Sequence, residues 1–230
     1  MGYVMETGIT KIKLVIYRDR GVIVGDTPFF SLVVDGFEKA CREAGYEMVL
    51  FNLDRHAEDY QKQVDNLLLD SSTAIVLYGS ELTDEEAAVF RKARTPFLML
   101  DYWNHDMSFA GVFINNADAA RMAGEYLINK GHREIGYLKG EYRLKSFGSR
   151  SVGLQIALQK HGLELKPEYI VTLPVTMDEA YQEMRKYLKR KPKLPTAFFA
   201  DNDNLALGAM QALKECGYKC SCVIKKHTRD

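Results

Sequence analysis

Short apolar runs alternate with amphipathic stretches along almost the whole chain, and this alternation limits the possible folds more than any other feature. The run KIKLVIY at 11–17 is typical of a buried strand. The stretch SLVVDGFEKACREAG at 31–45 places apolar residues three and four positions apart, which predicts a helix that ends at Gly45. Strands separated by such helices pair in parallel through right-handed crossovers, so the sequence predicts an α/β fold.

The same alternation runs twice, which predicts two doubly wound, parallel-sheet (Rossmann-like) lobes. In the first series we expect strands and helices in turn at 46–53, 57–70, 73–79, 83–94 (capped by Thr83) and 96–101, followed by a shorter strand at 110–115. In the second series we expect helices and strands in turn at 116–131, 133–140, 150–162, 168–173, 177–190, 196–200 and 204–217. The predicted organisation is a tail at 1–10, an N-terminal lobe at 11–114, a C-terminal lobe at 115–220 and a divergent tail at 221–230.

The composition excludes several classes of partner. Of 230 residues, 31 are Lys or Arg and 31 are Asp or Glu, so the net charge is zero. A neutral chain has no electrostatic attraction of its own for nucleic acid or an anionic membrane. No apolar run approaches the roughly 20 residues of a membrane helix, and the N-terminus does not resemble a secretory signal. We therefore expect a cytoplasmic protein with reduced cysteines.

Polar and aromatic residues follow nearly every predicted strand. Ligands of doubly wound sheets bind beyond the carboxyl ends of the strands, where these residues come together. Carboxylates and amides bind hydroxyls, guanidinium groups donate in a fixed fork, and aromatic rings cover C–H faces, so the set suits a neutral polyol. The alternative is that some are helix caps or solvated loop residues. The candidates are Arg18 to Arg20, Phe29, Phe30, Asp54, Ser80, Asp101 to Trp103, Asn115, the loop at 140–150, Val175, Thr176 and Asp201 to Asp203.

Enzyme motifs do not fit the sequence. It contains no G-x-S-x-G elbow, P-loop or H-E-x-x-H helix, and YRDRGVIVGDTPFF after the first strand lacks a dinucleotide fingerprint. Asp101 and Asp203 remain an alternative as a glycosidase pair, although paired polar groups in a sugar cleft also serve as binders. We expect no catalytic residue and no cofactor.

Metal sites fit no better. DNDNLALG at 201–208 begins like a calcium loop, but Leu205 takes the fifth position and the Gly and Glu of that motif are missing. Cys216, Cys220, Cys222 and His227 are four potential zinc ligands, but their spacing does not match a familiar zinc motif. We therefore expect no metal.

Four segments together resemble the effector-binding domain of LacI/GalR-type transcriptional regulators. GHREIGYLKG followed by RSVGLQIAL resembles the family pattern G-H-x-x-I-x-x-L-x-G and R-x-x-G-[FY]-x-x-A-[LM]. ADNDNLALG resembles the pattern A-x-N-D-x-x-A-x-G, TPFF resembles N-P-F-F, and TPFLMLD resembles I-P-V-V-x-x-D. The likeness runs from about residue 11 to 218. It implies a type I periplasmic-binding-protein fold, an effector site between the lobes and a homodimer.

The resemblance also implies a set of ligand-binding residues. Asp101 matches an effector-contacting Asp after the fourth strand. Asn202 matches an Asn that faces the ligand, and Asp203 is its partner and an additional helix cap, whereas Asp201 has no matched role. Effectors in the family are usually sugars, sometimes purines or other small metabolites, and we expect a sugar. The complete expected set is Phe29, Phe30, Asp101, Trp103, Ser146, Arg150, Asn202 and Asp203.

The sequence departs from the family pattern at both ends. Only ten residues precede the first predicted strand, so we expect DNA binding only through a helix-turn-helix domain absent from this chain. After ECGYK the chain reads CSCVIKKHTRD instead of the family's I-P-x-D motif and return crossovers. CSCVI fits a replacement strand, but the effector-contacting Asp of that motif is missing. We therefore expect a C-terminally incomplete fold, a weakened effector site and more lobe motion than in a complete homologue.

The sequence thus favours the effector-sensing core of a LacI/GalR-type regulator, in which a bound sugar alters the dimer and thereby its DNA-binding arms. A free-standing sugar-binding receptor of the same fold is one alternative, and the lack of a signal sequence speaks against it. A glycosidase is the other.

Overall fold

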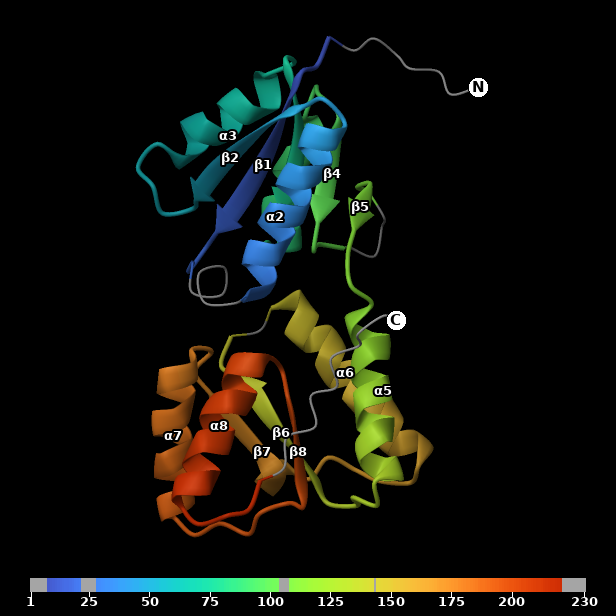
Figure 1. The fold of residues 1–230 in the computed structure, drawn as a ribbon, viewed down its shortest axis with the longest axis vertical. Helices are drawn as coiled ribbons and strands as arrows, with labels where there is room; N and C mark the ends of the chain where they lie inside the picture. Colours follow the sequence, from blue (N-terminus) through green and yellow to red (C-terminus); the bar gives the residue numbers. More distant parts are fainter. Residues whose placement is uncertain (1–7, 22–27, 104–107, 143, 221–230) are drawn as a thin grey trace. The chain divides into compact units, whose positions relative to one another are not determined.

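A computed structural model describes residues 8–21, 28–103, 108–142 and 144–220 (Figure 1). They divide into two compact units: the described residues within Met1–Asn115 and Leu144–Ser146 form unit 1, and those within Asn116–Arg143 and Phe147–Asp230 form unit 2. The tail predicted at 221–230, which includes most of CSCVI, lies outside the described residues. In the part of the chain that is described, no helix is both long and apolar enough to cross a membrane.

The described residues of unit 1 form a five-stranded parallel sheet with the order β2-β1-β3-β4-β5. In β1, Lys11 lies opposite both Glu47 of β2 and Thr73 of β3, so the three strands start level. Their carboxyl ends consequently open onto the same edge of the sheet. The strands are β1 (Lys11–Arg18), β2 (Glu47–Asp54), β3 (Thr73–Tyr78), β4 (Phe97–Leu100) and β5 (Gly111–Val112).

Helices cover both faces of this sheet. Because side chains alternate along a strand, Val15 and Tyr17 of β1 pack with α3 (Tyr60–Leu69) and α4 (Asp84–Ala88), while Leu14 and Ile16 pack under α2 (Pro28–Glu43). All four β1 side chains are fully buried. Unit 1 is therefore doubly wound, as the sequence predicts.

The helix predicted at 83–94 differs from expectation in its second half. Thr83 is the N-cap, as predicted, and forms a reciprocal capping box with Glu86. The α-helical part ends at Ala88, and a 3-10 helix, η1 (Val89–Lys92), continues the chain. Phe90 of this 3-10 helix is buried in the core of unit 1. The change from α-helix to the more tightly wound 3-10 helix thus occurs where the segment packs on the core.

Unit 2 has a three-stranded parallel sheet in its described part, with the order β7-β6-β8. One face packs against α7 and α8 and the other against α5 and α6 (Figure 1). Both units therefore have the doubly wound α/β architecture that the sequence predicts. The elements are α5 (Asn116–Asn129), β6 (Ile135–Gly140), α6 (Lys145–Lys160), η2 (Pro167–Tyr169), β7 (Ile170–Leu173), α7 (Met177–Lys189), β8 (Ala197–Ala200) and α8 (Asp203–Glu215).

A partly buried ion pair joins β1 to the end of α3 and makes the stability of unit 1 depend on pH. Asp70 Oδ2 lies 2.5 Å from Lys13 Nζ and 2.9 Å from Thr73 Oγ1. The hydrogen bond from Lys13, followed by those from Ser72, holds the pKa of Asp70 well below its ordinary value. A carboxyl group with a lowered folded-state pKa stabilises the fold above its unfolded pKa of about 4, and this contribution is lost as the pH falls below that value.

Replacing Asp70 with Asn is therefore expected to destabilise the protein by roughly 1–2 kcal/mol at neutral pH, because hydrogen bonds to a charged acceptor are lost. The difference from the wild type should shrink as the pH falls below about 4. Urea denaturation at neutral and acidic pH measures both values. Asp65→Asn, on the exposed face of α3, is the control and should change little at either pH. A wild-type advantage over Asp70→Asn that grows on acidification would contradict the assignment.

Candidate functional site

Three polar side chains meet beyond the carboxyl ends of β3 and β4 in unit 1. Asp101 follows β4, and its Oδ2 accepts hydrogen bonds from the Ser80 hydroxyl and, at 3.4 Å, from the Tyr78 hydroxyl. Asp101 has a φ of 55°, a left-handed conformation that Asp tolerates better than most residues. Burial, and then the charge of Asp101, raises the pKa of Tyr78 to about 12, so its hydroxyl remains a donor at neutral pH. The carboxylate is thus held in place by Tyr78 at the end of β3 and by Ser80, two residues beyond it.

The three expected aromatic contacts differ in accessibility. The ring of Phe30 lies 5.4 Å from that of Tyr78, edge to face, and packs on the core residues Leu14 and Ile16. Phe29, its neighbour in the first turn of α2, is 45% exposed. Trp103, two residues beyond Asp101, is partly buried. Phe29 is therefore the more accessible of the two phenylalanines, whereas Phe30 is part of the packing against the core.

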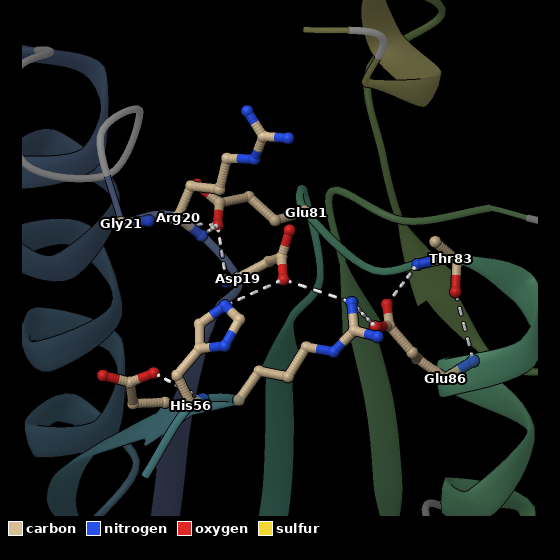
Figure 2. A network of polar contacts seen from close by, with 9 residues as sticks. Asp19, Arg20, Gly21, His56, Glu81, Thr83 and Glu86 are labelled. Atoms are coloured by element: carbon tan, nitrogen blue, oxygen red, sulfur yellow. Dashed lines mark hydrogen bonds and ion pairs between the residues drawn. The ribbon is translucent and has the colours of Figure 1, made fainter.

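A charged network lies beyond the ends of β1 and β2 (Figure 2). Arg55 Nη1 lies 3.1 Å from Asp19 Oδ1 and 2.5 Å from Glu86 Oε1, and His56 Nε2 lies 3.4 Å from Asp19 Oδ1. Glu86 also accepts the backbone N–H of Thr83 at 2.9 Å. The charge of Glu86 is the main cause of the raised pKa of Arg55. The network ties α4 to the carboxyl ends of β1 and β2.

Glu81 holds the segment that follows β1. Its Oε2 accepts the backbone N–H groups of Asp19, Arg20 and Gly21 at 2.7, 3.0 and 3.3 Å (Figure 2). Sequence reasoning named Arg18 to Arg20 but missed both Glu81 and Glu86. Glu86 has a sequence signal, the T-x-x-E capping box. Glu81 has none, because its partners are about sixty residues away.

Asp201 anchors the corresponding edge of unit 2. Its side chain is 1% exposed and accepts the Tyr137 hydroxyl at 2.6 Å and the Gly140 backbone N–H at 2.9 Å. Both donors belong to β6, the strand next to β8. The sequence offered no role for Asp201, and the structure shows that it joins the ends of two strands.

Arg150 is also oriented by this edge. Its Nε donates to Asn116 Oδ1 at 2.9 Å, and its Nη1 donates to the backbone oxygen of Asp201. The guanidinium also lies 5.7 Å from the Phe147 ring. Two hydrogen bonds from different nitrogens fix the plane of the group, which is the preorganisation that a recognition arginine needs.

The loop expected at 140–150 is shorter than predicted, because α6 begins at Lys145 rather than at Arg150. Phe147 is 2% exposed and packs so close to Gly140 that a Cβ there would lie 2.7 Å from its ring. Phe147 lies in the additional helical turn at 145–149, so this turn packs on the core of unit 2. Ser146 and Arg150 therefore lie four positions apart on one helix.

The prediction that Asp203 caps the last helix is wrong. Asn202, not Asp203, is the N-cap of α8, and its Oδ1 accepts the Leu205 N–H at 3.0 Å. Asp203 is exposed in the first helical turn. An Asn cap uses its oxygen for the helix, so what Asn202 offers a ligand is its amide donor.

Within the described ranges, no group of three or more His, Cys, Asp or Glu residues is arranged to hold a metal ion. Two of the potential zinc ligands, Cys222 and His227, lie outside those ranges.

Two doubly wound units with hydrogen-bonding side chains at the carboxyl edges of their sheets are the architecture of the α/β class of binding proteins. The chain belongs to the family of periplasmic binding proteins and sugar-binding domains of the LacI family, whose model matches residues 11–226. The resemblance described from the sequence motifs is thereby confirmed.

Curated relatives of the chain are transcriptional repressors. It is 27% identical over 208 residues to the HTH-type transcriptional repressor PurR of Actinobacillus pleuropneumoniae serotype 5b (strain L20), covering 90% of this chain and 62% of the relative. It is 28% identical over 196 residues to PurR of Yersinia pestis (strain Pestoides F), covering 84% of this chain and 57% of the relative. The chain thus spans less than two thirds of the length of these relatives.

Solved structures of LacI-family regulators share the fold. A sugar-binding transcriptional regulator of the LacI family from Escherichia coli, complexed with phosphate, aligns with a TM-score of 0.73 at 27% identity, over 91% of this chain and 74% of that one. The transcriptional regulator CelR in complex with cellobiose aligns with a TM-score of 0.77 at 23% identity, over 91% of this chain and 64% of that one. The second match is evidence for the fold alone.

Proposed function

We propose that the chain is the effector-sensing part of a LacI-family transcriptional regulator and that its effector is a small polar molecule, most simply a sugar. The observation that carries the proposal is the family match over residues 11–226. In this proposal the protein is a non-enzymatic regulator that works in the cytoplasm as a homodimer, and DNA is bound by a helix-turn-helix domain outside this chain. The location of the effector between the two units remains a prediction from the resemblance.

The chemistry of the two sheet edges supports a polyol. Unit 1 supplies the Asp101 carboxylate and the Phe29 ring, and unit 2 supplies the oriented guanidinium of Arg150, the amide of Asn202 and the exposed carboxylate of Asp203. Carboxylates accept from hydroxyls, amides and guanidinium groups donate to them, and aromatic faces cover C–H surfaces.

The regulatory step follows from linkage. A ligand shifts a conformational equilibrium only by its difference in affinity for the two states. In this proposal the sugar binds one arrangement of the units more tightly and thereby changes the affinity of the complete regulator for DNA. An effector bound equally by both arrangements would have no such effect.

A panel of mono- and disaccharides and purine bases, screened by thermal shift and followed by calorimetric titration, tests the proposal. We expect at least one member to bind and to raise the midpoint of unfolding, because a ligand that binds only the native state stabilises it. Binding of none would overturn the proposal. Incubation with nitrophenyl glycosides is the test of the non-enzymatic assignment, and we expect no turnover.

Two substitutions locate the effector on the chain. Asp101→Asn and Arg150→Lys are each expected to weaken binding about tenfold or more, because each removes a charged or bidentate hydrogen-bonding group. Arg121→Lys is the matched control, because Arg121 pairs with Asp118 and Glu125 along its own helix. Titration calorimetry of the three variants with the identified effector gives the comparison. Equal affinities for all three would remove these residues from the site.

A further inference from the structure

Three successive backbone amides after β1 converge on one carboxylate oxygen. Glu81 Oε2 accepts the N–H groups of Asp19, Arg20 and Gly21 at 2.7, 3.0 and 3.3 Å, and Figure 2 shows the three donors gathered around that oxygen. Gly21 has a φ of +71°, the left-handed conformation that lets consecutive N–H groups point to the same side. Amides arranged in this way form a concave anion-binding nest.

The occupant of this nest belongs to the chain itself. Glu81 lies three residues beyond β3 and reaches the segment after the neighbouring strand β1. Its other oxygen, Oε1, is shielded from solvent and has no hydrogen-bond partner among the described residues. One oxygen of Glu81 therefore carries the contact to all three amides.

Arg55, which follows β2, is likewise engaged by acidic side chains. Arg55 pairs with both Asp19 and Glu86. An anionic ligand at this edge would have to displace Glu81 from the amides and would then face the charges of Asp19 and Glu86. Like charges at a partly buried edge repel each other more strongly than they do in bulk water.

We propose that Glu81 is an internal anion that fills a phosphate-type nest of the Asp19, Arg20 and Gly21 amides, and that it makes this edge selective against anionic ligands. The carboxyl edge of unit 1 then admits neutral polyols and rejects their phosphate esters. The selectivity for the effector rests on the proposed function, whereas the occupied nest does not. The nest and its occupant are tested separately with inorganic phosphate.

The test compares wild-type protein with Glu81→Ala by following the backbone amide signals of Arg20 and Gly21 in ¹H–¹⁵N spectra during a titration with inorganic phosphate at constant ionic strength. We expect Glu81→Ala to bind phosphate at these amides at least about tenfold more tightly than the wild type, because the competing internal anion is gone. Glu81→Gln keeps an acceptor without the charge and should fall between the two.

Glu85→Ala is the matched control, since it removes one nearby negative charge from an exposed residue that does not contact the nest. It should respond to phosphate as the wild type does. Wild-type amides that shift as strongly as those of Glu81→Ala would overturn the proposal, as would a folded Glu81→Ala whose amides do not respond. If Glu81→Ala does not fold, the phosphate titration of Glu81→Gln is the test. Amide signals of Glu81→Gln that respond to phosphate no more than those of the wild type would overturn the proposal.

The selectivity is tested with a panel of sugars and their phosphate esters. Phosphorylated sugars that bind the wild type better than their neutral counterparts would overturn the selectivity while leaving the proposed function intact.

Discussion

Gly153→Ala is expected to lower the midpoint of thermal unfolding by about 10 °C, the largest effect of any single methyl group that we foresee in this protein. Gly153 lies on α6 where the helix crosses α5. A Cβ at this position would lie 2.0 Å from the backbone oxygen of Ala117 and 3.0 Å from the Cβ of Ala120. No rotamer relieves a contact between a Cβ and a backbone oxygen, so the two helices must separate. Overpacking of this kind costs typically 1–3 kcal/mol and sometimes more, and we expect about 3 kcal/mol here.

Gly148→Ala on the same helix is the matched control. A Cβ at Gly148 would meet nothing within 4 Å. Alanine favours a helix over glycine by up to about 1 kcal/mol, so this variant should unfold at the wild-type temperature or slightly above it. Differential scanning calorimetry of both variants gives the comparison. If Gly153→Ala proved as stable as Gly148→Ala, the close approach of α5 and α6 would be refuted.

Asp201→Ala is expected to destabilise the protein by about 3 kcal/mol, because two donors lose their acceptor inside the protein. These are the Tyr137 hydroxyl and the Gly140 N–H, which now donate to the two oxygens of Asp201. A buried donor without a partner costs roughly 1–3 kcal/mol. The backbone oxygen that receives Arg150 is retained in the alanine variant, so the expected loss concerns stability first.

A double-mutant cycle separates the contributions to this effect. Tyr137→Phe removes one of the two donors, so Asp201→Ala should cost less in its presence than in the wild type, and chemical denaturation of all four proteins gives the coupling energy. Asp203→Ala, two positions along the chain and exposed, is the control and should change stability by no more than about 0.5 kcal/mol. Equal effects of Asp201→Ala and Asp203→Ala would show that Asp201 is not the anchor of this edge.

The family motifs of the sequence can now be understood as packing requirements. Gly153 is the glycine of the R-x-x-G segment and permits the α5–α6 approach. Gly208, the last residue of ADNDNLALG, permits a second approach: a Cβ there would lie 2.5 Å from the backbone oxygen of Met177 at the start of α7. Sequence reasoning found both motifs and used them to identify the family. It did not foresee that these glycines allow the two pairs of helices to pack closely.

The polar residues of DNDN show the limit of sequence reasoning most clearly. Four similar side chains stand in a row at 201–204, and the sequence assigned the helix cap to Asp203 and no role to Asp201. The structure buries Asp201, makes Asn202 the cap and exposes Asp203. The difference arises from the pairing of β8 with β6, which sets Ala200 opposite Leu138 and so brings Asp201 to the Tyr137 hydroxyl and the Gly140 amide.

The sequence by itself determined the order of strands and helices, the doubly wound class of both units and the family, because apolar periodicity and short motifs are local properties of a chain. Only the tertiary structure decided which polar groups at the sheet edges form hydrogen bonds within the protein. Glu81 and Asp201 each find their donors about sixty residues away, across neighbouring parallel strands. Such partners depend on strand order and register, which arise from the packing of the whole unit. They therefore cannot be predicted from the residues that neighbour Glu81 or Asp201 in the sequence.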